Sequence, residues 1–242
     1  MLLQGRTAVV TGGTRGLGRA VARAMADAGA VVVAAARDVP EEPPDGDRRI
    51  VAVEADVTVP GSVEALMKTV GARYGGPHIV VANAGISRPG PVAGLSYEHW
   101  DAVVGTNLTG VFHTVRAAVP YLRDVVDGRI ITVSSILGRR AVPGAAAYCA
   151  SKAAVERFTE VCALELAADG ITVNCLAPGF IDEGQGRALM ADERLWPRLS
   201  AGLAAGRPGT GAEVGAAAVF LASAQSGYVN GAVLPVDGAV RW

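Results

Sequence analysis

The sequence predicts a single α/β domain over residues 1–242, in which a seven-stranded parallel sheet is doubly wound with helices on both faces. Two observations support this fold class. Seven short runs of apolar, largely β-branched residues show little polar alternation, which is typical of strands buried on both faces of a parallel sheet. Stretches with helical periodicity separate these runs along the whole chain, as expected when strands and helices alternate.

The expected strands are Thr7–Thr11, Val31–Ala35, Ile50–Val53, Ile79–Ala82, Arg129–Val133, Thr172–Leu176 and Ala232–Val236. Apolar residues recur at helical spacing between several of these strands. Gly29 supplies a C-terminal stop for the first expected helix, and Ser96 supplies an N-cap for a later one. The periodic positions are Leu17, Val21, Ala24 and Ala28; Val63, Leu66, Met67, Val70 and Tyr74; and Trp100, Val103, Val104, Asn107, Leu108 and Val111.

Two segments interrupt the alternation of strand and helix. Pro40–Arg49 is rich in proline and charge, and we expect a surface loop there. Residues 180–208 are rich in glycine, arginine and alanine and contain no clear strand. Because long irregular segments near strand ends often cover a binding site, we expect residues 180–208 to form a substrate lid.

Composition excludes a disordered chain and disfavours polyanionic partners. Hydrophobic residues make up 50% of the chain against 19% charged residues, which is enough apolar material for a buried core. The formal net charge is -1, so no basic field attracts nucleic acid or an anionic membrane. We therefore expect neither nucleic acid nor membrane as a partner.

Cysteine and histidine usage predicts a reducing compartment and no metal. Cys149, Cys162 and Cys175 lie far apart, so we expect free thiols. The three histidines show no ligand spacing, so no metal site is expected. Neither a signal peptide nor an apolar run long enough to cross a bilayer is visible, and the expected location is cytoplasmic.

A glycine-rich turn joins the first strand to the first helix, with the sequence Thr11-Gly12-Gly13-Thr14-Arg15-Gly16-Leu17-Gly18. Glycines allow a sharp turn and close approach to a pyrophosphate, while the N–H groups and dipole of the new helix face that anion. The position between a strand and a helix is the context that this mechanism requires. The turn therefore predicts a dinucleotide site.

The sharpest catalytic signal is Tyr148-Cys149-Ala150-Ser151-Lys152, in a stretch that reads as helix to about residue 168. Tyr148 and Lys152 are i and i+4, so both side chains project from one helix face. A phenol is a weak acid at neutral pH, with an unperturbed pKa of about 10. A nearby ammonium favours the phenolate, so we expect Tyr148 to exchange a proton with a substrate oxygen.

The glycine turn resembles Thr-Gly-x-x-x-Gly-x-Gly of the short-chain dehydrogenase/reductase family, and the later motifs of that family follow in order. The series comprises Asp56-Val57, Asn83-Ala84-Gly85, Asn107, Ser135, Tyr148, Lys152, Asn174 and Pro178-Gly179. It covers nearly the whole chain. The resemblance implies a Rossmann-type fold and an oxidoreductase that moves a hydride between a nicotinamide cofactor and a carbonyl/alcohol pair.

The resemblance also assigns roles to site residues. Catalytic roles fall to Asn107, Ser135, Tyr148 and Lys152. Ser135 would orient the carbonyl oxygen; Ser134 competes for that role, but the match of Ser135-Ile136-Leu137-Gly138 to the Ser-x-x-Gly of the family favours Ser135. Asn107 would kink its helix and hold a water in a proton relay to the lysine. The residues expected to contact the cofactor are Gly12, Thr14, Arg15, Gly16, Leu17, Gly18, Arg37, Asp56, Val57, Asn83, Ala84, Gly85, Tyr148, Lys152, Pro178, Gly179 and Ile181.

Charge near the second strand favours NADP(H) over NAD(H). An acidic residue at the end of that strand would bind the ribose 2′-hydroxyl of NAD and repel the 2′-phosphate of NADP. Here Arg37 follows the strand, and Arg15 is available from the glycine turn, so two guanidiniums could bind the phosphate. A shift of one residue would put Asp38 in place of Arg37.

The sequence departs from the family pattern at three positions. Ala82 replaces the first asparagine of Asn-Asn-Ala-Gly, and His78 stands where an aspartate is usual, which we interpret as a surface residue. Glu183 replaces a threonine that helps to hold the nicotinamide carboxamide. An ionised carboxylate cannot donate a hydrogen bond, so we expect backbone groups near Ile181 to hold the carboxamide.

The chain resembles β-ketoacyl-acyl-carrier-protein reductases and small-molecule ketoreductases. We expect an NADP(H)-dependent ketoreductase, with a carrier-protein substrate as the alternative. The segments Asp124–Gly128 and Ala167–Gly170, taken as the rim of the active-site entrance, are acidic and would not attract an acidic carrier. A non-catalytic NADP-binding regulator would not need all four catalytic residues, and a nucleotide-sugar epimerase or dehydratase would need a larger substrate domain.

Excess apolar residues on the expected helices around Asn107 and Tyr148 predict self-association. They are Val111, Val115, Ala153, Phe158, Val161 and Leu164. The resemblance implies a homotetramer formed through these helices and the C-terminal strand.

Overall fold

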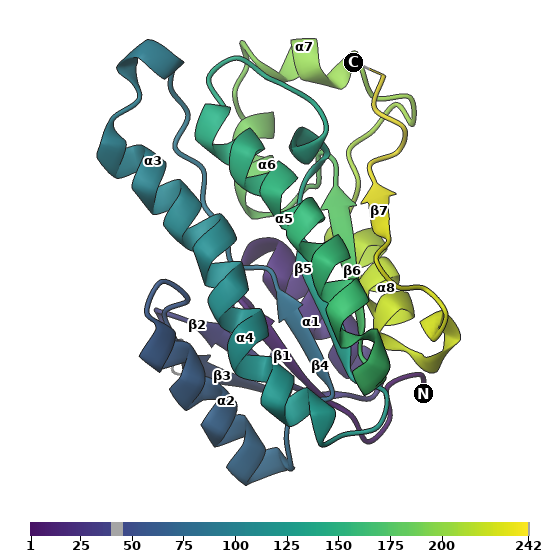
Figure 1. The fold of residues 1–242 in the computed structure, drawn as a ribbon. Coiled ribbons are helices and arrows are strands. Elements are labelled where there is room, and N and C mark those ends of the chain that lie inside the picture. The colour runs from purple at the N-terminus through teal and green to yellow at the C-terminus, as the bar shows by residue number, and fades with distance from the viewer. Residues whose placement is uncertain (40–45, 242) are drawn as a thin grey trace.

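A sheet of seven parallel strands forms the centre of the computed structural model, which describes residues 1–39 and 46–241. The strands are β1 (Thr7–Thr11), β2 (Val31–Ala36), β3 (Ile50–Glu54), β4 (Ile79–Ala82), β5 (Arg129–Val133), β6 (Thr172–Pro178) and β7 (Val233–Val236). In space they are ordered β3-β2-β1-β4-β5-β6-β7, so the winding reverses between β1 and β4 (Figure 1). The doubly wound, parallel fold predicted from the sequence is confirmed.

Helices cover both faces of this sheet. One face packs against α2 (Pro60–Tyr74), α4 (Gly110–Arg123) and α5 (Ala146–Leu166), and the other against α1 (Gly16–Asp27) and α8 (Gly211–Ala222) (Figure 1). Three further helices, α3 (Tyr97–Val104), α6 (Gly184–Met190) and α7 (Trp196–Ser200), lie beyond the carboxyl ends of the strands. None of the helices in the described part of the chain is both long and apolar enough to cross a bilayer.

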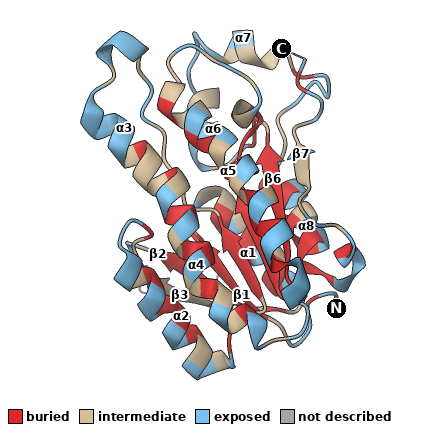
Figure 2. Ribbon diagram, in the orientation of Figure 1, coloured by how far each residue is buried: buried red, intermediate tan, exposed pale blue. Residues whose placement is uncertain are grey.

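Burial on both faces explains why the strands lack polar alternation. Val9 packs into the core beneath α2, α4 and α5, whereas its neighbours Ala8 and Val10 pack into the core on the side of α1 and α8. All five residues of β1 are buried. Figure 2 shows the central strands as buried and the outer faces of the helices as exposed. A polar residue at either face would therefore lose its contact with water.

The helix ends follow the local signals in part. Gly29, with φ 105°, lies just beyond α1, and the Ser96 hydroxyl accepts a hydrogen bond from the His99 amide at the start of α3.

The sequence predictions did not include α8. Its N-terminus carries a capping box, in which Thr210 and Glu213 each accept from the backbone N–H of the other. The sequence Thr-x-x-Glu was the signal that could have located it.

Positions 40–45 of the expected loop Pro40–Arg49 lie outside the described residues. At its far end, Arg49 donates from its side chain to the Asp47 carboxylate just before β3.

His78 is not the surface residue expected from the sequence. Its ring is partly buried at the start of β4, where Nδ1 accepts a hydrogen bond of 3.2 Å from the Thr7 amide. Burial and the nearby charge of Arg6 lower the pKa of His78. The ring therefore joins β4 to β1 in its neutral form, because a protonated Nδ1 could not accept that bond.

Candidate active site

A deep cleft opens at the carboxyl ends of the strands. Its volume is about 1360 Å³, which exceeds the ~300–1,000 Å³ of ordinary small-ligand pockets. One wall is formed by the glycine turn and the ends of β2 to β4, and the other by α5 and residues 178–199. The cleft lies where the winding of the sheet reverses, which is where open α/β sheets bind their ligands.

The glycine turn has the shape of a phosphate cradle. Gly12 and Gly16 adopt left-handed backbone conformations, with φ of 65° and 52°. A Cβ on Gly18 would lie 2.1 Å from the carbonyl oxygen of Gly12, so no side chain fits there. No side chain caps the N-terminus of α1, which leaves its first N–H groups to a ligand in the cleft. These features fit a pyrophosphate.

Asn83 and Thr11 fix this turn to the end of β4. The Asn83 side chain donates to the Thr11 carbonyl oxygen at 2.8 Å. The Thr11 hydroxyl in turn accepts from the amides of Asn83 and Ala84, at 3.1 and 3.2 Å. The sequence predictions included Asn83 and Ala84 but not Thr11 as a site residue. Its signal was a threonine hydroxyl at the last position of a buried strand.

Two arginines face the part of the cleft beyond β2. β2 ends at Ala36, so Arg37 is the first residue after the strand, and it lines the cleft together with Arg15 and Asp38. Both guanidiniums are exposed. Burial raises the pKa of Asp56, but hydrogen bonds from Thr58 and the charge of Arg37 outweigh burial and lower it. A phosphate bound in this part of the cleft would thus contact the positive charges of Arg15 and Arg37 beside the exposed carboxylate of Asp38.

The two serines after β5 point to different partners. Ser134 is buried, and its hydroxyl donates to the Lys152 carbonyl oxygen at 3.0 Å and to Glu156 Oε1 at 3.1 Å. Ser135 lines the cleft, and its hydroxyl is hydrogen-bonded to Tyr148. The geometry therefore makes Ser135, rather than Ser134, available to a substrate oxygen.

Tyr148 and Lys152 lie on the cleft side of α5. The Lys152 ammonium lies 5.7 Å from the centre of the Tyr148 ring and donates to the Val133 carbonyl oxygen at 2.8 Å. Burial raises the pKa of Tyr148, and the Ser135 hydrogen bond partly opposes this effect. Burial also lowers the pKa of Lys152 to about 8. The decrease in the tyrosine pKa that we expected from the lysine is thus absent in the chain alone.

Asn107 lies in a π-helical turn, Gly105–Thr109, between α3 and α4. Its side chain is fully buried and exchanges two hydrogen bonds with the backbone of Ile86, at 2.8 and 3.0 Å. It also donates to the Ser151 hydroxyl at 3.2 Å. π-Helical turns between α-helical segments are rare and often mark functional sites. Asn107 thus joins the segment that follows β4 to α5.

The segment after β6 lies across the cleft from the glycine turn. Pro178, Gly179 and Ile181 line the cleft. A Cβ on Gly16 would lie 3.2 Å from the Cα of Gly184, so the two backbones nearly touch. Gln185 reaches from this segment to the Gly85 carbonyl oxygen, to which its amide donates at 3.1 Å.

Glu183, at the position of the family threonine, has its carboxylate near the start of α8. A Cβ on Gly211 would lie 3.0 Å from Glu183 Oε1, and Glu183 Oε2 is 4.0 Å from the Arg187 guanidinium. The Glu183 carboxylate therefore lies near Gly211 and Arg187, outside the glycine turn.

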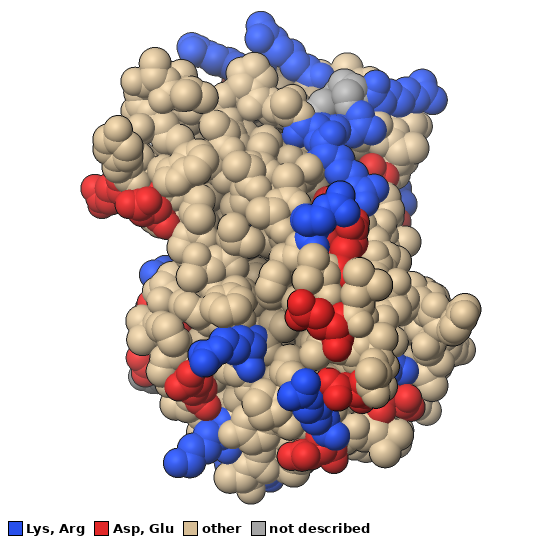
Figure 3. Space-filling model, in the orientation of Figure 1, with Lys and Arg blue, Asp and Glu red and all other residues tan. Residues whose placement is uncertain are grey.

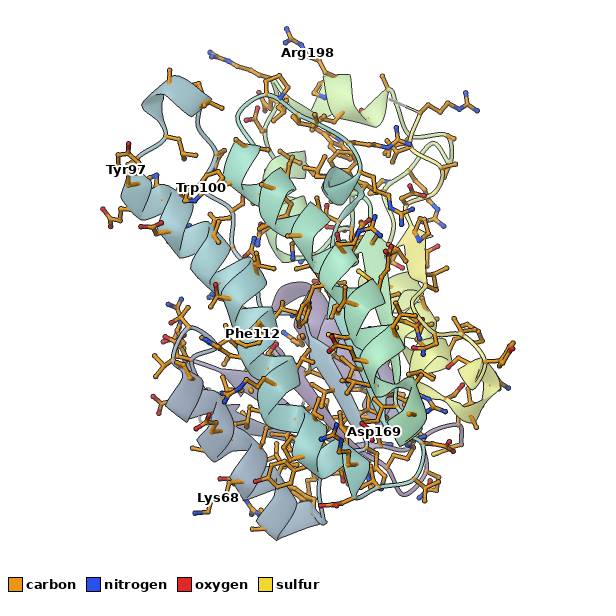
Figure 4. The ribbon with its side chains drawn as sticks, viewed as in Figure 1. Lys68, Tyr97, Trp100, Phe112, Asp169 and Arg198 are labelled. Carbon is orange, nitrogen blue, oxygen red and sulfur yellow. The ribbon has the colours of Figure 1, made fainter. Side chains whose placement is uncertain are left out.

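The acidic segments that we took as the rim of the entrance lie elsewhere. Asp127 precedes β5 and Asp169 precedes β6, so both are at the amino ends of the strands, opposite the cleft. Figure 4 shows Asp169 at the far end of the molecule from Arg198 on α7. Asp169 pairs with Arg123 at 2.8 Å. The expectation of an acidic entrance rim was wrong for a single chain, because it placed two loops at the wrong edge of the sheet.

The described residues contain no group of three or more His, Cys, Asp or Glu side chains arranged to hold a metal ion. All three cysteines are free, and Cys162 and Cys175 are buried.

Comparison with known sequences identifies the family. A family model described as Enoyl-(Acyl carrier protein) reductase matches residues 12–240. The 3-oxoacyl-[acyl-carrier-protein] reductase FabG of Vibrio cholerae is 37% identical over 243 residues, and the match covers 99% of each chain. FabG of Escherichia coli is 36% identical over 248 residues, with 99% of each chain covered.

Solved structures agree with this family. An NADP-bound protein from Agrobacterium tumefaciens, provisionally assigned as a 2-deoxy-d-gluconate 3-dehydrogenase, has a TM-score of 0.89 and 35% identity over 98% of this chain and 96% of its own. The aldohexose dehydrogenase of Thermoplasma acidophilum has a TM-score of 0.88 and 30% identity over 98% of this chain and 94% of its own.

Proposed function

From the membership of this chain in the short-chain dehydrogenase/reductase family, which makes it an oxidoreductase of carbonyl/alcohol pairs, we propose that it is an NADPH-preferring ketoreductase with Tyr148 as its acid–base group. The observation that carries this proposal is the juxtaposition of Ser135, Tyr148 and Lys152 in the cleft beside a glycine turn that fits a pyrophosphate.

The bound nicotinamide cofactor would supply the hydride, and the residues of this chain would place the substrate and move the proton. Ser135 would donate a hydrogen bond to the carbonyl oxygen and orient it. Tyr148 would donate its proton to the same oxygen, within the cleft that α5 and residues 178–199 line. The Lys152 ammonium, fixed by Val133, would stabilise the phenolate that remains.

The preference for NADPH rests on Arg15 and Arg37. Both guanidiniums line the cleft and could pair with a 2′-phosphate, which NADH lacks. The NADP-bound relative supports use of this cofactor within the family. The remaining cofactor contacts that we propose are those expected from the sequence, including Asp56-Val57 and Asn83-Ala84-Gly85, all of which line the same cleft.

Residues 180–208 would form a lid over the substrate. Apolar side chains of this segment form a cluster with Ile136, Leu137 and Val240, and several members of the cluster line the cleft. The members of this cluster that line the cleft are Ile136, Leu137, Phe180, Leu189 and Leu199. An apolar wall of this kind suits a substrate whose body is mostly hydrocarbon around its carbonyl group.

Exposed apolar residues favour association of this chain with copies of itself through α4 and α5. Phe112 on α4 is 45% exposed, and Val161 and Leu164 on α5 are 45% and 82% exposed. The surface over α3 and the first turns of α4 carries few charged side chains (Figure 3). A homotetramer is the form that we propose. The free cysteines suit the reducing cytoplasm.

Separate titrations of NADPH and NADH, followed by a screen for turnover, test this function. The screen covers ketones, β-ketoacyl thioesters, quinones and secondary alcohols. Turnover of free ketones with NADPH supports the ketoreductase, whereas activity restricted to carrier-bound β-ketoacyl thioesters would support the reaction named for the FabG relatives. Tight NADPH binding without turnover on any of them would instead favour a non-catalytic regulator.

A further inference from the structure

Glu156 is a buried carboxylate on α5, one helical turn beyond Lys152. Only 8% of its surface is exposed. A buried carboxylate is costly unless it is paired and hydrogen-bonded. Both of its oxygens are used: Oε1 accepts from the Ser134 hydroxyl at 3.1 Å, and Oε2 accepts from Arg139 Nε at 2.7 Å.

These two partners flank Ser135 in the chain. Ser134 precedes it directly, and Arg139 follows a single 3₁₀ turn, Ile136–Gly138, whose N-cap is Ser135. The turn is tight, since the Leu137 amide donates to the Ser135 hydroxyl at 3.2 Å. The carboxylate thus binds the loop on both sides of the serine that faces Tyr148.

Gly138 shows how closely the loop packs on this carboxylate. A Cβ at Gly138 would lie 2.7 Å from Glu156 Oε1 and 2.7 Å from the Ser134 hydroxyl oxygen. It would also lie 3.2 Å from the backbone of Lys152. The loop after β5 therefore rests against α5 over the turn that joins Lys152 to Glu156.

We propose that Glu156 is a positioning residue that holds the hydroxyl of Ser135 in line with Tyr148 by fixing Ser134 and Arg139 to α5. The inference rests on the proposed function, because it assumes that Ser135 orients the substrate carbonyl. Glu156 touches neither the cleft nor the cofactor site, since it is not among the residues that line the cleft.

The effect is geometric rather than electrostatic. Arg139 neutralises the Glu156 charge at 2.7 Å, and the Lys152 ammonium is directed to the carbonyl oxygen of Val133. Loss of the carboxylate should therefore lower the rate constant of the chemical step without moving the pH profile. A displacement of about 1 Å in a reacting group can cost on the order of 100-fold in rate.

Four variants test this inference. They are Glu156→Ala, Glu156→Gln, Ser135→Ala and the double variant Glu156→Ala/Ser135→Ala, with Glu160→Ala as the matched control. Glu160 lies one turn further along α5, where its carboxylate pairs with Arg157 away from Ser134. Steady-state kinetics use NADPH and a ketone that the parent protein reduces.

We expect Glu156→Ala to lower kcat on the order of tenfold to 100-fold, with KM for NADPH within about twofold and the pH profile unchanged. Glu156→Gln should retain much of kcat, because its amide oxygen can still accept from Ser134. In the Ser135→Ala background, Glu156→Ala should have no further effect, since the hydroxyl that it positions is gone.

Hydrogen exchange provides a readout that needs no turnover. The amides of residues 137–139 should exchange faster in Glu156→Ala than in the parent, and at the parental rate in Glu160→Ala. Parental kcat and parental exchange in Glu156→Ala would overturn the inference, as would an equal loss of kcat with and without Ser135. A parent protein that reduces no ketone would instead refute the proposed function, and the exchange measurement would still decide the role of Glu156.

Discussion

The ammonium of Lys152 lies 5.7 Å from the centre of the Tyr148 ring, over the aromatic face rather than paired with an acid. Burial has the largest effect on the pKa of both groups. It raises the pKa of Tyr148 above its ordinary value and lowers the pKa of Lys152 to about 8. The lysine therefore loses its proton more readily than an exposed lysine, while the tyrosine keeps its own.

Reduction should consequently weaken on the alkaline side when Lys152 loses its charge. We expect kcat/KM for ketone reduction to fall as the pH rises through about 8, because the ammonium is needed to stabilise the phenolate. Lys152→Met should lower kcat/KM on the order of 100-fold to 10,000-fold and should remove this decline near pH 8. A pH profile of the methionine variant that matches the parent would contradict the role of the lysine.

Arg37→Ala should weaken NADPH selectively. A charge-assisted hydrogen bond contributes about 1.5–3 kcal/mol, so its loss should raise the Kd for NADPH on the order of 10-fold to 100-fold. The Kd for NADH should stay within about twofold, because NADH has no 2′-phosphate. Fluorescence titration of both cofactors measures the difference. Arg23→Ala, which removes an exposed guanidinium of α1, is the matched control. An equal loss of affinity for NADPH and NADH in Arg37→Ala would argue against the assignment of Arg37 to the 2′-phosphate.

Thr11→Val should lower the stability of the fold and weaken the binding of both cofactors. Valine has the shape of threonine but leaves the amides of Asn83 and Ala84 without the hydroxyl that accepts from them. We expect the free energy of unfolding to fall by about 1–3 kcal/mol. NADPH and NADH should both bind less tightly, since the glycine turn loses two of the hydrogen bonds that connect it to the end of β4. Thr69→Val on the exposed side of α2 serves as the control, and similar denaturant midpoints for the two variants would count against this role.

His78 should make the fold sensitive to mild acid. Its pKa is lowered in the folded chain, so the unfolded chain binds a proton at higher pH and stability falls as the pH drops below about 6.5. Protonation of Nδ1 also removes the bond from the Thr7 amide, which is worth about 1 kcal/mol.

His78→Gln should therefore lose less stability than the parent between about pH 7.5 and about pH 5.5 in urea denaturation. His99→Gln, which changes an exposed ring on α3, should behave like the parent. An unchanged pH dependence in His78→Gln would show that the ring does not carry the effect.

The sheet was predictable because its strands are buried on both faces. Runs such as Ile79–Ala82 and Arg129–Val133 have the bounds expected from the sequence. β6 extends two residues further than expected, to Pro178, because Pro178 pairs in register with Val236 of β7. No local pattern predicts such a pairing, since it depends on a strand far along the chain.

Parts of the candidate site were predictable from local sequence patterns. These parts are the glycine turn and the i, i+4 pair of Tyr148 and Lys152. The supporting contacts were not. Thr11 and Glu156 act across elements distant in sequence, and His78 was interpreted as a surface residue because its contact with Thr7 of β1 is also long-range. Long-range contacts of this kind require the relative positions of the strands.

Gly16 and Gly184 meet backbone to backbone at the phosphate end of the cleft, and neither has a side chain that could rotate aside. Widening the cleft at this point therefore requires movement of the main chain. Rotamer changes take picoseconds to nanoseconds, whereas loops move over nanoseconds to microseconds. The two glycines thus place any opening of this part of the cleft in the slower class of motion, that of the polypeptide around residue 184.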